Sequence, residues 1–135
     1  MNRLFFSALI CITVISCTNN GKDAVDKRIS LRTDTINVVK LTDTLVINQS
    51  TCRGCEYEKS TNFAISDSMN MIKLFDVITI DNNPDNMDGG NINKDLILVP
   101  LKAGTTIFKL YKFWTQEKTA TDSAGFITYK IEVKQ

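Results

Sequence analysis

Apolar and polar residues alternate along much of the chain from residue 33 onward, which is the pattern of β-strands. The clearest run lies near the C-terminus, where Ile127, Tyr129, Ile131 and Val133 alternate with Thr128, Lys130, Glu132 and Lys134. Such a strand places one face on a core and the other in water. Similar or continuously apolar runs predict further strands within residues 36–38, 44–48, 71–81, 95–101 and 105–114.

Turn-forming residues separate these runs at short intervals. Gly, Asn, Asp, Pro and Ser gather at residues 48–54, 82–85, 88–91, 103–104 and 123–125. No segment shows convincing helical spacing, and residues 66–75 are the one place where a short helix would fit. Short strands with regular turns over about a hundred residues predict one all-β domain. We expect a single antiparallel immunoglobulin-like β-sandwich over residues 33–135.

The N-terminus begins with a positive charge and an apolar run. Arg3 precedes residues 4–15, which are apolar apart from one serine and one threonine. At about 1.5 Å per residue, a helix of this length is too short to cross a hydrocarbon layer of about 30 Å. The run is therefore typical of a signal peptide, which we assign to residues 1–16. The alternatives are an ordinary secretory signal beside an unrelated cysteine, or a short membrane anchor.

The end of this segment, Val14-Ile15-Ser16-Cys17, resembles the bacterial lipobox. The resemblance implies that Cys17 carries a diacylglycerol and that the chain is cleaved after Ser16. It therefore predicts a lipoprotein anchored in the bacterial cell envelope, either periplasmic or surface-exposed. Thr18 stands where an aspartate would retain an enterobacterial lipoprotein at the inner membrane, and this favours the outer membrane.

Residues 17–32 are polar and charged after the cysteine, so we predict that they form a flexible tether. The sequence has 16 basic and 15 acidic residues, and loss of Arg3 with the signal leaves 15 of each. A neutral domain without a lysine or arginine cluster lacks the positive surface that nucleic-acid binding requires. We therefore exclude nucleic acid as a partner.

The sequence contains no histidine, which removes the commonest general base and the usual zinc and iron ligands. Asp85 and Asp88, with asparagines nearby, offer oxygen atoms of the kind that calcium prefers. Their spacing is not that of an EF-hand, and turn geometry explains them better. We predict no enzyme activity, no cofactor and no metal.

Cys52-Arg53-Gly54-Cys55 is the most conspicuous motif of the domain. A redox-active motif of this spacing opens a helix after a strand, and the residues after Cys55 do not predict a helix. A metal site would need further soft ligands, and c-type haem attachment would need histidine in place of Glu56. A local disulfide in an oxidising compartment is the favoured interpretation, and a thiol-redox role is the alternative.

The C-terminal half of the chain resembles the chagasin-type inhibitors of papain-like cysteine proteases. The resemblance rests on a glycine pair, the phrase from residue 96 to residue 114, and the strand from 126 to 133. Those inhibitors are immunoglobulin-like sandwiches, often secreted or lipid-anchored in bacteria, whose three loops at one end plug the protease cleft. The resemblance implies that the partner-binding loops contain Asn48, Thr51, Arg53, Gly54, Gly89, Gly90, Lys112, Phe113 and Trp114. Gln49 and Phe113 stand where the family has prolines, and Cys52 and Arg53 interrupt its first loop.

Trp114 is the only tryptophan, and two interpretations of it stay open. Tryptophan is a frequent interface anchor. On alternation, however, it shares a face with Phe108 and Leu110 and would be buried unless the strand ends at Phe113. Three functions follow as hypotheses: a protein-binding domain that inhibits a papain-like cysteine protease, a structural or assembly lipoprotein of the envelope, and a thiol-redox lipoprotein.

Overall fold

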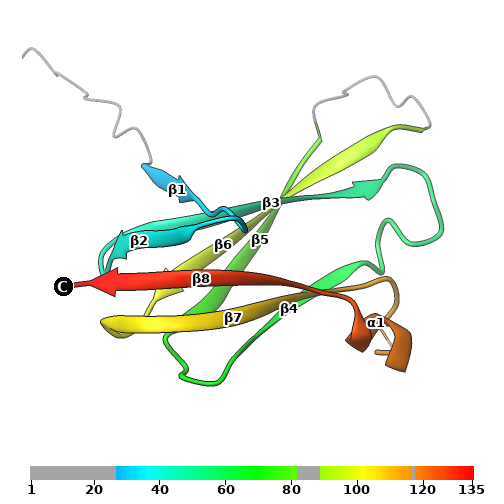
Figure 1. The fold of residues 1–135 in the computed structure, drawn as a ribbon. Coiled ribbons are helices and arrows are strands. Elements are labelled where there is room, and N and C mark those ends of the chain that lie inside the picture. Colours follow the sequence, from blue (N-terminus) through cyan, green and yellow to red (C-terminus); the bar gives the residue numbers. More distant parts are fainter. Residues whose placement is uncertain (1–26, 82–88, 117) are drawn as a thin grey trace, which may run out of the picture.

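The computed structural model describes residues 27–81, 89–116 and 118–135. The elements are β1 Arg28–Ser30, β2 Ile36–Lys40, β3 Thr44–Cys52, β4 Asn62–Asp67, β5 Ile72–Ile80, β6 Asn91–Pro100, β7 Gly104–Phe113, α1 Ala120–Ala124 and β8 Phe126–Lys134. They form one sheet of order β1-β3-β6-β5 and a second of order β2-β8-β7-β4, packed face to face (Figure 1). The predicted all-β sandwich is confirmed.

Most neighbouring strands are antiparallel, but the first two strands are not. β1 runs parallel to β3, and β2 runs parallel to β8. The sequence predicted a purely antiparallel sandwich, so this is a correction. Its cause is the short connection over residues 31–35, by which the chain leaves an edge of one sheet and joins an edge of the other.

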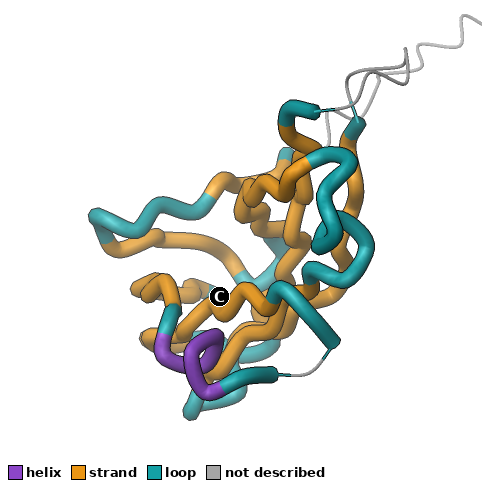
Figure 2. The backbone as a smooth tube through the Cα atoms, turned by 90° about the vertical axis from the view of Figure 1, so that its right-hand side faces the viewer, coloured by secondary structure: helices purple, strands orange, loops and turns teal. Residues whose placement is uncertain are grey.

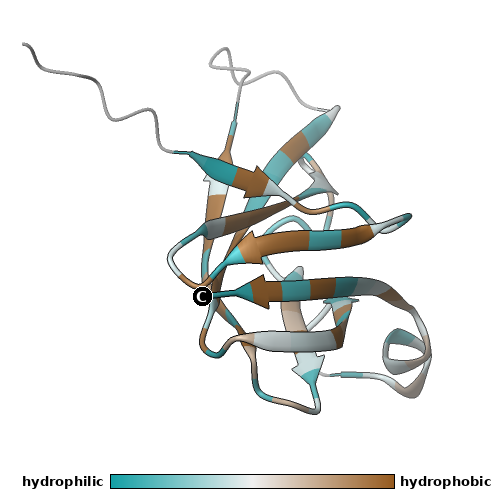
Figure 3. Cartoon of the chain, turned by 60° about the vertical axis from the view of Figure 1, so that its left-hand side comes forward, coloured by the Kyte–Doolittle hydropathy of each residue, from teal (hydrophilic) through white to brown (hydrophobic). Residues whose placement is uncertain are grey.

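The core lies between the sheets and is built from the inward-facing residues of both. Leu45, Leu96, Leu98, Phe108 and Ile131 are fully buried there. The alternation that predicted β8 is visible in Figure 3, where hydrophobic and hydrophilic residues alternate along the strand that ends at the marked C-terminus. Burial of these side chains is what holds the two sheets together.

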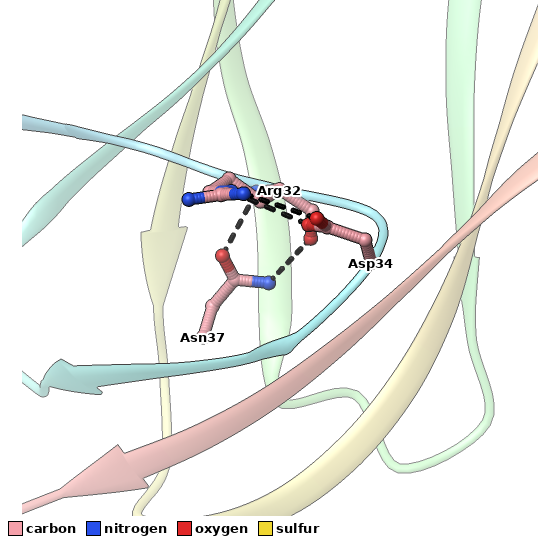
Figure 4. A network of polar contacts seen from close by, with 3 residues as sticks. All are labelled: Arg32, Asp34 and Asn37. Carbon is pink, nitrogen blue, oxygen red and sulfur yellow. Dashed lines mark hydrogen bonds and ion pairs between the residues drawn. The ribbon is translucent and has the colours of Figure 1, made fainter.

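Asn37, at the start of β2, is the buried polar residue that ties the crossing segment to the second sheet (Figure 4). Its side-chain amide donates to the carbonyl oxygens of Arg32 (2.8 Å) and Lys130 (3.0 Å), and its carbonyl oxygen accepts from the Arg32 N–H (2.9 Å). Every strong polar group of this side chain therefore has a partner, as burial demands. Arg32 also forms an exposed ion pair with Asp34.

The described domain begins earlier than predicted. The sequence set the boundary between tether and domain at residue 33, but β1 starts at Arg28 and Leu31 is packed in the core at 7% exposure. Three residues are too few to show a period, which explains the difference. The predicted signal peptide, Cys17 and the rest of the tether lie outside the described residues, as do Asp85 and Asp88.

The segment in which a short helix would fit does not form one. Residues 66–75 contain the end of β4 and the start of β5 rather than a helix, and α1 lies instead at Ala120–Ala124. A capping box begins α1, because the Thr119 hydroxyl accepts from the Asp122 N–H while the Asp122 carboxylate accepts from the Thr119 N–H. Within the described ranges, no helix has the length and apolar character needed to cross a membrane.

Candidate functional site

Three connections emerge at the same end of the sandwich. Cys52 at the end of β3 pairs with Asn91 at the start of β6, and Phe113 at the end of β7 pairs with Asn62 at the start of β4. The described residues of the β3–β4 loop (53–61), the β5–β6 loop (81–90) and the β7–β8 loop (114–125) are therefore neighbours, and we call these described residues together the loop end. It lies at the right of Figure 1 and faces the viewer in Figure 2. Of the β5–β6 loop, the structure describes Asp81, Gly89 and Gly90.

The β3–β4 loop opens with a disulfide. Cys52 is the last residue of β3, and its sulfur is bonded to that of Cys55, with the two Cα atoms 5.8 Å apart. The predicted disulfide is confirmed. Residues 53–60 form bends and turns, so Cys55 does not stand at the start of a helix. The positive helix terminus that lowers the pKa of a redox-active thiol is therefore missing at this motif.

Arg53 and Gly54 form the tip of this short ring. The Arg53 N–H donates to the carbonyl oxygen of Gly90 (2.9 Å), and its guanidinium pairs with the Asp81 carboxylate. Gly54 has a φ of +69°, which suits glycine, and its N–H donates to Glu58 Oε2 (2.5 Å). The first loop is thus joined to both ends of the β5–β6 loop.

Trp114 lies just beyond the end of β7, and this decides its position. Because the strand stops at Phe113, the tryptophan leaves the core face and is 43% exposed. Its ring meets Tyr57 edge-on, with centroids 6.1 Å apart, and its carbonyl oxygen accepts from the Ser60 hydroxyl (2.6 Å). Tyr57 and Ser60 belong to the β3–β4 loop, so these contacts join the first and third loops.

A hollow of about 410 Å³ opens beside these rings. It is lined by Tyr57, Trp114, Thr115, Thr119, Thr121 and Asp122, and its walls are mainly apolar. A concave apolar surface with a few polar groups is the usual form of a recognition site. At the loop end it is formed by residues of the first and third loops.

Lys112 supports Trp114 from the inner side. Its ammonium lies over the Trp114 ring, 4.4 Å from the ring centroid, and donates to the Ser50 carbonyl oxygen of the opposite sheet (2.6 Å). Burial lowers the pKa of this lysine. Lys112 is half-buried and is the residue before the last of β7, so the structure places it in a strand and not in a loop.

Three other predicted loop residues also lie in strands, which corrects their assignment. Asn48 and Thr51 belong to β3, which continues to Cys52 because its backbone pairs with β6 along this whole length. Asn48 donates to Asp95 (2.6 Å), whereas Thr51 is 2% exposed and its hydroxyl has no hydrogen-bond partner in the described part of the chain. Phe113 is 3% exposed and stacks on Tyr111. Whether any of them contacts a partner stays a prediction.

Gly89 and Gly90 lie in the predicted second loop, directly before β6. Their φ angles are +94° and +82°, a region that side chains disfavour, and no described atom lies within 4 Å of the place where a Cβ would stand. The glycines therefore serve backbone conformation rather than close packing.

Sequence reasoning missed two residues of the loop end. Tyr57 was passed over because a single aromatic residue among polar neighbours shows no period, yet it is 40% exposed and contacts Trp114. Asp81 stood only as the end of a predicted strand, and its ion pair with Arg53 joins residues that are distant in sequence. Within the ranges that the structure describes, no cluster of three or more His, Cys, Asp or Glu side chains is arranged for a metal ion.

The solved structures with a similar fold include two that are matched over nearly their whole length. The cysteine protease inhibitor EhICP2 from Entamoeba histolytica has a TM-score of 0.51 and 19% identity, covering 79% of this chain and 96% of the inhibitor. The solution structure of Amebosin has a TM-score of 0.56 and 14% identity, covering 79% of this chain and 98% of Amebosin. These likenesses establish the fold. No family model and no curated protein matches the sequence.

Proposed function

We propose that this chain is a lipid-anchored protein of the bacterial envelope whose β-sandwich inhibits a papain-like cysteine protease. Cys17 holds it at the outer membrane, and the loop end occupies the protease cleft by shape, without chemistry. The observation that carries the proposal is the exposed Trp114 at the loop end of this fold, because a solved neighbour of the same fold is a cysteine protease inhibitor.

The loop end has the composition of an interface centre. Trp114 and Tyr57 are exposed aromatic residues in contact with each other, and aromatic side chains of this kind dominate binding energy at interfaces. The carbonyl oxygen of Tyr57 accepts hydrogen bonds from Thr61, and that of Trp114 accepts from the Ser60 hydroxyl. Because these bonds already hold both backbones, little order has to be gained when a partner binds.

The test is inhibition of papain-like proteases by the full chain in detergent. We expect stoichiometric inhibition of peptide hydrolysis by at least one member of a panel, with the inhibitor recovered uncleaved. A serine protease, whose catalytic site has another shape, serves as the control and should be unaffected. A folded chain that inhibits no member of the panel contradicts the proposal and leaves the structural or assembly lipoprotein as the better hypothesis.

A further inference from the structure

Arg53 lies between the two cysteines of the disulfide, and its backbone N–H and its guanidinium contact opposite ends of the β5–β6 loop. Its backbone N–H donates to Gly90, the residue directly before β6, at 2.9 Å. Its guanidinium pairs with Asp81, the residue directly after β5. One residue of the first loop therefore holds both ends of the second loop.

The two side chains of this ion pair differ in exposure. The Arg53 side chain is only 10% exposed, whereas that of Asp81 is 44% exposed. Guanidinium and carboxylate form charge-assisted hydrogen bonds with defined geometry. A nearly buried guanidinium aimed at Asp81 has little surface left for a partner, so its effect on binding must pass through the loops that it joins.

The disulfide explains how a residue at a loop tip keeps a fixed direction. The bond closes a ring of four residues, and so short a ring adds little to global stability. Its effect is local, because it restricts the backbone at Arg53 and Gly54. The Gly54 N–H is held in addition by Glu58 (2.5 Å) on the far side of the turn.

We propose that Arg53 is a positioning residue that fixes the tip of the β3–β4 loop against Asp81 and Gly90, and that the Cys52–Cys55 disulfide keeps it in the orientation this requires. The inference rests on the proposed function, since it explains how the tip of the β3–β4 loop is held in one orientation, against Asp81 and Gly90, before a protease binds. Preorganisation strengthens binding by removing the entropy lost when loops become ordered.

The first measurement is hydrogen–deuterium exchange of the full chain in detergent, which does not require the target cysteine protease. Arg53→Met and Asp81→Asn should each raise exchange in peptides from residues 50–58 by about tenfold or more, because local opening becomes easier. Exchange around Leu98, in the centre of β6, should not change. Arg32→Met is the matched control, since Arg32 forms an exposed ion pair with Asp34 outside the loop end.

The second measurement is the inhibition constant for a papain-like protease. Arg53→Met and Asp81→Asn should each weaken inhibition by roughly tenfold. The double variant should be no worse than either single variant, because both remove the same link. Cys52→Ser with Cys55→Ser should change exchange and inhibition in the same direction, whereas Arg53→Lys should retain part of both.

Two results would overturn the inference. Unchanged exchange in both Arg53→Met and Asp81→Asn would show that the link does not hold the loops. Weaker inhibition by Arg53→Met alone, with Asp81→Asn like the wild type, would show that Arg53 touches the protease itself. If the wild type inhibits no protease, the proposed function fails and the exchange result alone decides the positioning role.

Discussion

Replacing Trp114 with alanine separates an interface role from a structural one. An aromatic side chain buries about 150–250 Å² when it is fully covered. Since 43% of Trp114 is exposed, roughly 65–110 Å² is left for a partner to cover. At about 25 cal/mol per Å², this area corresponds to about 1.6–2.7 kcal/mol of binding free energy. Trp114→Ala should therefore raise the inhibition constant by roughly 15- to 100-fold.

The effect of Trp114→Ala on folding should be smaller than that of a core tryptophan. The variant loses the edge contact with Tyr57, of about 0.5–1.5 kcal/mol, and the contact with the Lys112 ammonium, of about 0.5–1 kcal/mol. A loss of about 1–2.5 kcal/mol in the free energy of unfolding is expected, against about 3–5 kcal/mol for a fully buried tryptophan.

The assay measures denaturant unfolding and the inhibition constant for the wild type, for Trp114→Ala and for two control variants. Phe75→Ala is the matched control, because Phe75 is an exposed aromatic residue (68%) on β5. It should leave inhibition unchanged, and so should Glu132→Ala on β8. Unaltered inhibition by folded Trp114→Ala would refute the interface role, and a loss of 3–5 kcal/mol in stability would show that the indole is structural.

Four further predictions concern the lipid anchor, the disulfide, the Asp67 carboxylate between β4 and β5, and the buried hydroxyl of Thr51. Cys17→Ala should abolish incorporation of a labelled fatty acid, and normal labelling would contradict the lipobox assignment. The purified chain should neither reduce insulin nor oxidise a model dithiol, and turnover lost in Cys52→Ser would favour the redox hypothesis. Asp67 is partly buried, which alone would raise its pKa, but hydrogen bonds from Thr106 and three backbone N–H groups outweigh this and lower it. Because its folded pKa lies below the unfolded value, its stabilisation is present above about pH 4 and is lost as pH falls through the folded pKa. Asp67→Asn should lower stability at pH 7 by about 2 kcal/mol and flatten the acid limb of an unfolding-against-pH curve. Thr51→Val should raise the free energy of unfolding by about 1 kcal/mol with inhibition unchanged, because no described residue bonds this buried hydroxyl. A loss of stability would show that the hydroxyl is bonded.

Alternation predicted the strands that matter most for the core. β8 keeps strict period two because Tyr129, Ile131 and Val133 face the other sheet, and this is a property that a sequence displays directly. β4 was missed because it is an edge strand whose residues are mostly half-buried on both faces, so no clear period arises. α1 was missed because five residues with no buried side chain carry no helical pattern.

The end of each strand, and therefore the content of each loop, could not be predicted. Family likeness suggested that a loop begins near Asn48, but pairing with β6 extends β3 to Cys52. That pairing joins residues some forty positions apart and leaves no local signal. The exposure of Trp114 could not be predicted for the same reason. Here the strand is shorter than alternation suggested: β7 stops at Phe113, so the indole leaves the core face.

The β3–β4 loop holds the loop end together. At its start, Arg53 contacts Asp81 and Gly90 of the second loop. Further along, Tyr57 and Ser60 contact Trp114 of the third. Between Arg53 and Ser60 the chain turns, with the Gly54 N–H donating to the Glu58 carboxylate, and Tyr57 lies within this turn. The contacts of Arg53 and those of Tyr57 and Ser60 involve different partners. Loss of the Arg53 contacts should therefore leave the contact between Tyr57 and Trp114 in place. Binding would then weaken by the share of the second loop alone, which is why the Arg53 and Trp114 variants should be additive while the Arg53 and Asp81 variants are not.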